Sequence, residues 1–349
     1  MPVFVEALGG QPLWTKKQAS SIHRTAVDAI RIALVNNMPD AALEDTELQF
    51  FDLLDAASGE LPVMVKLYSI TGVPRTERGL RRLSSFYYDL EALWNSQSDA
   101  LIMTGTEPQQ PSLRQEPYWI NMAKVLDWAE KNTLSTVLSC LAAHAGVLHS
   151  DGIERHRLND KRFGVFEFPR AANHELTRGV RDGVRFPHSR WNEVRADALE
   201  SCGYTILTQS TDAGVDCFVK KKNQSLFVHF QGHPEYQAET LFKEFRRDVR
   251  RFLREERETY PAAPVGYFGE EVTECLIEFQ KKATASRIEG VMEEFPEPLL
   301  TRSLRNGWRA PAVNVYRNWL QLIAEKKAEI FSFAPVKVRR IGNTLQWMG

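Results

Sequence analysis

The chain has 349 residues, 43% of them hydrophobic, and its 44 Lys and Arg are balanced by 45 Asp and Glu. This size and apolar content predict one large α/β domain with an appendage, or two domains. The near-zero net charge provides no general attraction for nucleic acid or an anionic membrane, so neither is expected as a partner.

Cysteine usage and the N-terminus indicate the compartment. Cys140, Cys202, Cys217 and Cys275 lie far apart without a Cys-x-x-Cys pair, which predicts neither a zinc site nor a disulfide framework. The N-terminus lacks the basic and apolar regions of a signal peptide, and no run reaches the ~18 apolar residues of a spanning helix. We therefore expect a cytoplasmic protein without a metal.

Periodicity begins after a leading segment, residues 1–30, that we expect to be irregular. Short apolar runs then predict strands at residues 31–35, 63–68, 100–103 and 136–138. A helix with an acidic first turn is expected from about residue 43, and an amphipathic helix over residues 118–131. These strand-helix alternations predict an α/β fold with a doubly wound, mostly parallel sheet.

The sequence becomes strand-rich beyond residue 152, and we expect an antiparallel extension of the sheet. The candidate strands are residues 164–168, 204–207, 216–219 and 226–228. A charged helix over residues 238–256 ends a catalytic domain that we expect to span residues 31–260. Residues 261–349 are expected to form a mostly helical C-terminal extension anchored by Trp308 and Trp319.

Cys140 is the most informative residue, because it follows an apolar strand and precedes a run of small residues. A strand, a sharp turn and a helix would place its thiol at the carboxyl end of the strand, where open α/β sheets carry reactive groups. His233 and Glu235 follow another apolar strand and could complete a Cys-His-Glu arrangement, in which the imidazole raises the reactive thiolate fraction. Taken singly, such a cysteine is more often part of a core. Together the residues favour an acyl-transfer or hydrolytic enzyme.

Several further motifs occur in order over residues 31–260. They are Asn36-Asn37-Met38-Pro39, Thr46-Glu47-Leu48-Gln49, Thr104-Gly105, Tyr118-Trp119, the Cys140 turn, Gly164-Val165, Pro187-His188-Ser189-Arg190, Gly232-His233-Pro234-Glu235-Tyr236 and Phe245-Arg246-Arg247-Asp248. In this combination the chain resembles the homoserine O-acyltransferases of methionine biosynthesis, of the homoserine O-succinyltransferase type. The resemblance implies a class I glutamine-amidotransferase-like, flavodoxin-like fold.

The resemblance also implies roles for individual residues. Cys140 matches the acylated nucleophile, His233 the general base and Glu235 the carboxylate that orients the histidine. Arg247 matches the residue that receives the acceptor's carboxylate, which suits the bidentate geometry of a guanidinium.

The remaining site residues follow from the same resemblance. Ser189 and Lys161 match nearby substrate contacts. The backbone N–H of Leu141, with one from the Gly105-Thr106 loop, is a candidate oxyanion donor.

The sequence departs from the family at two points near this oxyanion site. Pro39 leads into Asp40, where these enzymes carry a lysine, and Leu141 occupies a position where tryptophan is common. Substrate choice could therefore differ from that of the family.

The implied reaction is a ping-pong transfer from an acyl-CoA co-substrate to the hydroxyl of homoserine, without a bound cofactor. Succinyl is favoured over acetyl as the acyl group. Three alternatives stay open: serine or another hydroxyl acceptor, a Cys-dependent hydrolase or amidotransferase-like enzyme, and a non-catalytic binding protein. The sequence does not decide whether the chain forms a homodimer.

Overall fold

The computed structural model describes residues 3–8, 12–14, 29–180, 182–333, 339–341 and 344–346. Within them, the central sheet has nine strands in the order β2-β1-β4-β3-β5-β6-β11-β10-β9. Its strands are β1 (Val3–Glu6), β2 (Pro12–Trp14), β3 (Ile30–Val35), β4 (Val63–Tyr68), β5 (Ala100–Met103), β6 (Ser135–Ser139), β9 (Thr205–Ser210), β10 (Gly214–Lys222) and β11 (Ser225–Phe230). Neighbouring strands in the stretch β1-β4-β3-β5-β6-β11 pair in parallel, which confirms the predicted mostly parallel sheet.

Helices cover both faces of this sheet. On β3, Ile32 and Leu34 join the apolar cluster that contains α2 (Asp40–Ser58), whereas Ala33 and Val35 join the cluster of α5 (Trp119–Asn132). Successive strand residues point to opposite faces, so this division explains why β3 is apolar throughout. The other helices of this half are α3 (Glu77–Phe86), α4 (Leu90–Trp94), η1 (Leu113–Gln115) and α6 (Leu141–Asp151).

We expected residues 1–30 to be irregular, but part of this leading segment belongs to the central sheet. Strand β1 pairs in parallel with β4, and Val3 and Val5 are fully buried. Two buried valines in a four-residue strand are too short a pattern to be recognised without the neighbouring strand.

The strand-rich region divides between two sheets. Strands β9 and β10 extend the main sheet in antiparallel fashion, as predicted. Residues 226–228 were expected in this extension, but they lie in β11, which pairs in parallel with β6. Residues 164–168 do not join the main sheet, and that prediction is wrong. They belong to β7 (His156–Pro169), which pairs with β8 (Gly183–Glu193) in a separate hairpin. The free edge of β7 is bonded by Val265 rather than by the main sheet: the N–H of Val165 donates to the carbonyl of Val265 at 2.8 Å, and the N–H of Val265 donates to the carbonyl of Phe163 at 3.0 Å. Helices η2 (Glu175–Thr177) and α7 (Ala196–Ser201) follow these two strands.

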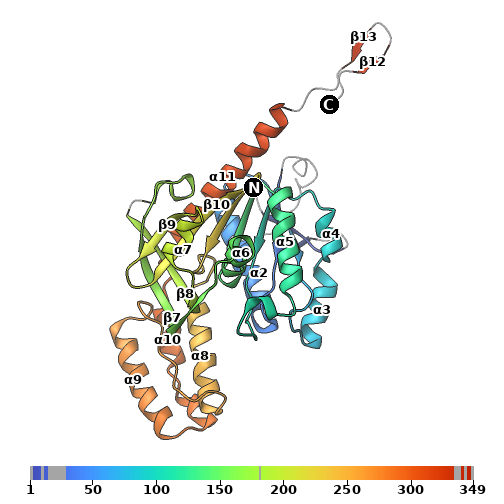
Figure 1. The fold of residues 1–349 in the computed structure, drawn as a ribbon. Helices are drawn as coiled ribbons and strands as arrows, with labels where there is room; N and C mark the ends of the chain where they lie inside the picture. The colour runs from blue at the N-terminus through green and yellow to red at the C-terminus, as the bar shows by residue number, and fades with distance from the viewer. Residues whose placement is uncertain are drawn as a thin grey trace.

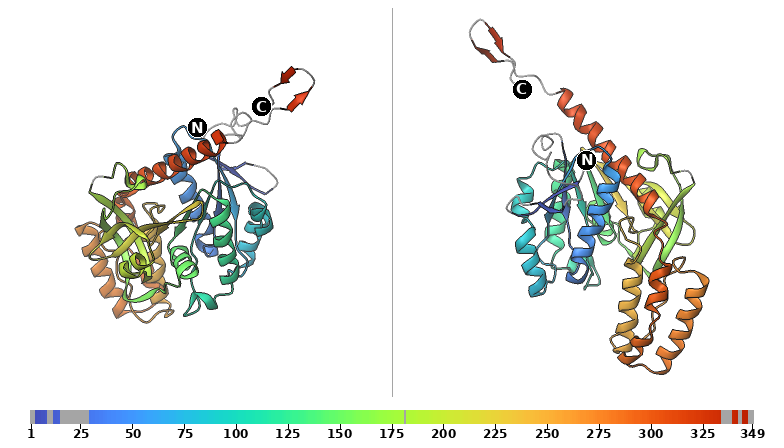
Figure 2. Two further views of the ribbon diagram at one scale, coloured as in Figure 1. Left: turned by 45° about the horizontal axis from the view of Figure 1, so that its top comes forward. Right: turned by 180° about the vertical axis from the view of Figure 1, so that it is seen from behind.

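The C-terminal part forms a helical lobe and a long returning helix. The helical lobe comprises α8 (Thr240–Leu253), α9 (Glu270–Ala285), η3 (Glu289–Glu294) and α10 (Glu297–Ser303), and it extends below β7 and β8 in Figure 1. Helix α11 (Arg309–Phe333) instead runs across the back of the sheet beside α2 (Figure 2). Strands β12 (Arg339–Ile341) and β13 (Thr344–Gln346) pair near the C-terminus.

The two predicted tryptophan anchors are buried. Trp308 Nε1 donates a hydrogen bond of 2.7 Å to the carbonyl of Tyr236, and Trp319 Nε1 donates one of 2.9 Å to Ser135 Oγ. Helix α11 is therefore part of the main core rather than a separate appendage. In the part of the chain that the structure describes, none of the helices combines the length and apolar character needed to span a membrane.

Candidate active site

Cys140 occupies a sharp turn between β6 and α6. Its φ of 55° and ψ of −114° form a conformation that residues other than glycine rarely adopt. Its backbone N–H donates a 2.8 Å hydrogen bond to the carbonyl of Phe230, so the neighbouring strand fixes the turn. A Cβ at Gly146 would lie 2.5 Å from Leu138 Cδ1, which shows how closely α6 packs on β6. The predicted strand, turn and helix are confirmed, and the thiol is partly exposed.

His233 and Glu235 lie in the loop after β11. His233 Nδ1 is 2.8 Å from Glu235 Oε1, and the two side chains are only 7% and 4% exposed. The hydroxyl of Ser139 donates to the same carboxylate oxygen at 3.0 Å. With Nδ1 engaged by Glu235, Nε2 is the ring nitrogen left to interact with Cys140.

These neighbours control the charge of His233. Burial opposes its protonation, but the Cys140 thiolate, the Glu235 carboxylate and hydrogen bonds to both outweigh burial and raise the pKa of His233 well above its ordinary value. The direction of this shift favours a protonated imidazole at His233. An imidazolium beside a thiolate is the reactive arrangement of enzymes with a cysteine nucleophile.

A buried layer supports the histidine loop. The side chains of His188 and Asp216 are fully buried, with Nε2 and Oδ1 3.2 Å apart. A Cβ at Gly232 would lie 2.5 Å from His188 Nε2, so this approach requires glycine. Burial, opposed by Asp216, lowers the pKa of His188 to about 4 and keeps the ring neutral. The N–H of His233 donates to the carbonyl of Pro187 at 2.8 Å, which connects the layer to the site.

The candidate oxyanion residues meet where the loop after β5 approaches α6. A Cβ at Gly105 would lie 2.9 Å from the backbone nitrogen of Leu141. Leu141 is the first residue of α6, so its N–H has no acceptor within the helix and benefits from the positive end of the helix dipole. Thr106 is 9% exposed in the same loop. A backbone donor therefore follows the cysteine directly.

The three candidate substrate contacts converge from β7, β8 and α8 on two acidic residues. The hydroxyl of Ser189 donates to Glu244 Oε2. Lys161 Nζ lies 3.5 Å from Glu244 Oε2 and 3.6 Å from Asp248 Oδ2. Arg247 Nε donates to Asp248 Oδ1 at 3.0 Å, with 49% of its side chain exposed.

Glu244 is a residue of this cluster that the sequence analysis did not single out. Its Oε1 accepts a 2.9 Å hydrogen bond from the hydroxyl of Tyr236, whose ring stacks on His233 with centroids 4.1 Å apart. Glu244 thus connects the candidate substrate contacts to His233. Its spacing of three residues from Arg247 places both on one helix face, a signal that could have identified it.

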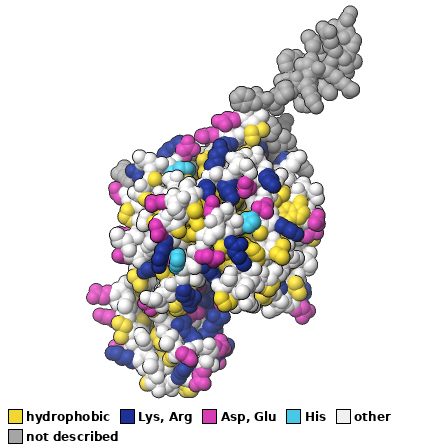
Figure 3. All heavy atoms as spheres, viewed as in Figure 1, with side chains coloured by type: hydrophobic (Ala, Val, Ile, Leu, Met, Phe, Trp, Pro, Cys, Tyr) yellow, Lys and Arg dark blue, Asp and Glu magenta, His cyan; other side chains and the backbone are white. Residues whose placement is uncertain are grey.

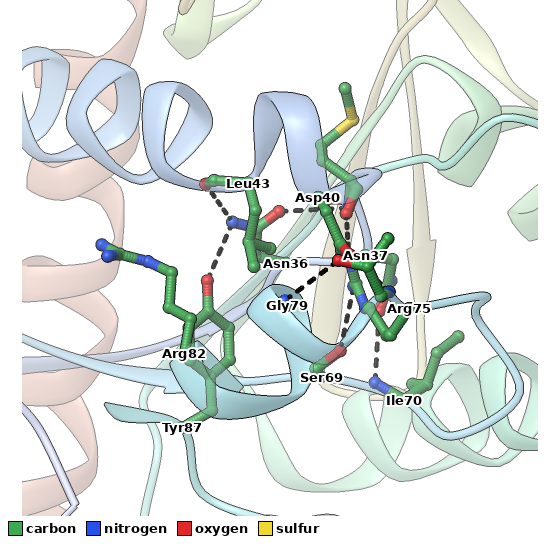
Figure 4. A network of polar contacts seen from close by, with 12 residues as sticks. Asn36, Asn37, Asp40, Leu43, Ser69, Ile70, Arg75, Gly79, Arg82 and Tyr87 are labelled. Atoms are coloured by element: carbon green, nitrogen blue, oxygen red, sulfur yellow. Dashed lines mark hydrogen bonds and ion pairs between the residues drawn. The ribbon is translucent and has the colours of Figure 1, made fainter. Parts of the chain in front are cut away.

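The loop after Met38 lacks the family's lysine but contacts another cation. Asp40 accepts hydrogen bonds of 2.6 Å from both the N–H and the hydroxyl of Thr76, and it pairs with Arg75 at 3.1 Å (Figure 4). Although burial acts the other way, these contacts lower the pKa of Asp40. The guanidinium of Arg75 also donates to the Met38 carbonyl and is 5% exposed. The loop is therefore held by an arginine from another segment.

The site defines a class of protein. Among the described residues, no group of three or more His, Cys, Asp or Glu side chains is arranged to hold a metal. A strained cysteine at the carboxyl edge of a parallel sheet, paired with a histidine that a glutamate orients, is typical of α/β enzymes with a cysteine nucleophile. The sheet and this turn agree with the class I glutamine-amidotransferase-like fold that the resemblance implied.

Comparison with known proteins identifies the family. Residues 7–329 match the family model described as homoserine O-succinyltransferase. A homoserine O-succinyltransferase from Rhodopseudomonas palustris is 44% identical over 301 residues, 86% of this chain and 90% of that protein. Those from Methylorubrum extorquens and Bradyrhizobium japonicum are each 41% identical over 86% of this chain, and over 88% and 93% of their own lengths. A glutamine amidotransferase structure from Thermotoga maritima aligns with a TM-score of 0.46 at 12% identity, over 85% of this chain and 98% of that chain. The chain belongs to the homoserine O-succinyltransferase family.

Proposed function

We propose that the enzyme transfers a succinyl group from succinyl-CoA to the hydroxyl of L-homoserine, through a thioester on Cys140, in a reducing cytoplasm. The observation that carries this proposal is the Cys140, His233 and Glu235 arrangement in a chain of this family. The name of the family supplies the acyl group and the acceptor. A CoA thioester suits the first step because exchange between two thiols is nearly isoenergetic.

In the first half-reaction the Cys140 thiolate attacks the thioester carbonyl. The backbone N–H of Leu141 stabilises the resulting oxyanion. As the bond between the carbonyl carbon and the CoA sulfur breaks, the His233 imidazolium gives its proton to the departing thiolate. The products are free CoA, a Cys140 thioester and a neutral imidazole.

The second half-reaction uses the same histidine as a base. Acylation removes the negative charge and the hydrogen bond of Cys140, which both raise the pKa of His233. Burial then weighs more heavily and favours the neutral ring, which takes the proton from the homoserine hydroxyl. The alkoxide attacks the thioester, the ester forms, and the Cys140 thiolate returns. Arg247 pairs with the carboxylate of the acceptor.

The direct test is an assay of the purified enzyme with either succinyl-CoA or acetyl-CoA, and with homoserine, serine or no acceptor. Release of the CoA thiol is followed over many turnovers. We expect turnover that depends on homoserine and is fastest with succinyl-CoA. Equal turnover without an acceptor would indicate a hydrolase, and a preference for serine would contradict the assignment of the acceptor.

A further inference from the structure

A strongly basic groove of about 600 Å³ lies between α8 and α10. Its basic lining residues are Lys243, Arg246, Arg247, Arg250, Arg251 and Arg254. Its acidic lining residues are Glu239, Glu256 and Glu297. Since the whole chain has a net charge of −1, this is a local concentration of positive charge. Figure 3 shows Lys and Arg side chains gathered at a hollow near the junction of the helical lobe and the main body.

The basic groove adjoins the cluster around Glu244 at Arg247. Arg247 belongs both to the groove and to the cluster around Glu244, whereas Cys140 and His233 do not line the groove. The spacing of Arg247, Arg250 and Arg254 places them along one side of α8. At about 1.5 Å of rise per residue, this row extends roughly 10 Å along the helix axis.

Two of these arginines, within the described residues, form no side-chain hydrogen bond or ion pair, although the hydrogen bond from Arg254 and the nearby charge of Arg250 together lower the pKa of the Glu289 carboxyl. Arg246 pairs with Glu297, and Arg254 pairs with Glu289 at 2.5 Å. In the described part of the chain, the side chains of Arg250 and Arg251 make neither a hydrogen bond nor an ion pair. Both therefore have guanidinium donors available for a ligand.

Stabilisation of the helix dipole explains only part of this arrangement. Arg250 and Arg251 lie in the last turn of α8, where cations stabilise the negative helix end. Lys243 and Arg246 line the same groove from the first half of the helix, where that effect is absent, and they pair with Asp45 and Glu297. Arg250 and Arg251 are therefore the cations of the groove that point to an anionic ligand.

We propose that the basic groove binds the 3′-phosphoadenosine diphosphate end of the CoA donor, an inference that rests on the proposed function. The pantetheine arm separates the CoA phosphates from the thioester, so a thioester held at Cys140 requires a phosphate site some distance away. Guanidinium groups bind phosphate oxygens through paired, charge-assisted hydrogen bonds. Arg250 and Arg251 provide these donors, and Arg247 at the mouth of the groove is left for the acceptor.

The first experiment compares two donors that differ only in the nucleotide end. Acylation of Cys140 is measured with succinyl-CoA and with the succinyl thioester of N-acetylcysteamine. The double variant Arg250→Gln/Arg251→Gln should raise the apparent KM for succinyl-CoA about tenfold or more, and should leave acylation by the short thioester unchanged. Lys281→Gln, which removes a charge from the helical lobe outside the groove, should match the wild type with both donors. Unchanged acylation by succinyl-CoA, or an equal loss with both donors, would overturn the proposal.

The second experiment does not require activity. Adenosine 3′,5′-bisphosphate is titrated into the wild type, the double variant and Lys281→Gln by calorimetry. The Kd should rise about tenfold in the double variant only. If this probe does not bind the wild type, or binds all three proteins equally, the phosphate site is wrong even where succinyl transfer occurs. If neither thioester acylates the enzyme, the proposed function fails, and the titration still decides whether the groove is a phosphate site.

Discussion

Gly105 lies against the backbone nitrogen of Leu141, so that a methyl group at position 105 would be 2.9 Å from that nitrogen and 2.7 Å from Leu141 Cβ. The loop after β5 and the start of α6 are thus in direct contact beside Cys140. Any side chain at position 105 would require a shift of the backbone around the Leu141 N–H, next to Cys140. A substitution at Gly105 can therefore perturb the candidate oxyanion donor without changing the side chains of Cys140, His233 or Glu235.

Gly105→Ala should therefore slow acylation of Cys140 by about 10²-fold, comparable with the loss of one oxyanion donor. The rate is measured by single-turnover release of CoA, with circular dichroism as the check on folding. Gly290→Ala is the matched control, because a Cβ there meets nothing within 4 Å. A wild-type acylation rate in Gly105→Ala would contradict the oxyanion assignment.

The strained backbone of Cys140 predicts that glycine at this position gives a more stable protein than alanine. A φ of 55° with a ψ of −114° disfavours any side chain. Cys140→Gly should therefore be more stable than Cys140→Ala by about 1–2 kcal/mol, although glycine usually destabilises a folded chain. Denaturant unfolding of both inactive variants measures the difference. If Cys140→Ala were as stable as Cys140→Gly, or more stable, the turn would not be strained.

The charge of His233 should depend on Cys140. Cys140→Ala removes the contributions of Cys140 that raise the pKa of His233, and burial then acts against Glu235 alone, so the pKa of His233 should fall. NMR titration of the imidazole in both proteins measures this shift. The same reasoning predicts that discharge of the acyl-enzyme slows as the pH falls below the lowered pKa, because the base becomes protonated. An unchanged pKa in Cys140→Ala would argue against the ion pair.

Arg247 should act on the acceptor and not on the donor. Arg247→Ala should accumulate acyl-enzyme that homoserine discharges poorly, with kcat/KM for homoserine lowered about 30-fold, corresponding to about 2 kcal/mol. This free-energy cost is at the lower end of the range for a lost charge pair, because the Arg247 side chain is half exposed and already contacts Asp248. Single-turnover discharge is compared with Arg302→Ala, an exposed arginine of α10. Equal discharge rates in the two variants would leave Arg247 without a role in acceptor binding.

The sequence predicted those features that local patterns determine. The apolar runs located β3, β4, β5 and β6, and the small residues after Cys140 indicated the sharp turn into α6. Short or unpatterned segments were harder to recognise. Strand β1 was missed because its two buried valines are informative only beside β4.

The site itself depends on contacts that no local pattern specifies. Lys161 and Ser189 lie on the β7–β8 hairpin, of which only residues 164–168 were predicted as a strand, and its packing against α8 brings them to Glu244. Arg75 reaches the loop after Met38 from a segment 37 residues away. Such contacts follow from tertiary packing, so the sequence could suggest the residue types but not their partners.

The central claim is that Cys140 carries the acyl group between donor and acceptor. Mass spectrometry of the intact enzyme, mixed with succinyl-CoA alone and then with homoserine, tests it most directly. We predict one added succinyl group on the wild type, its loss on addition of homoserine, and no label on Cys140→Ala. A label that persists in Cys140→Ala, or a wild type that turns over without any labelled intermediate, would contradict the account.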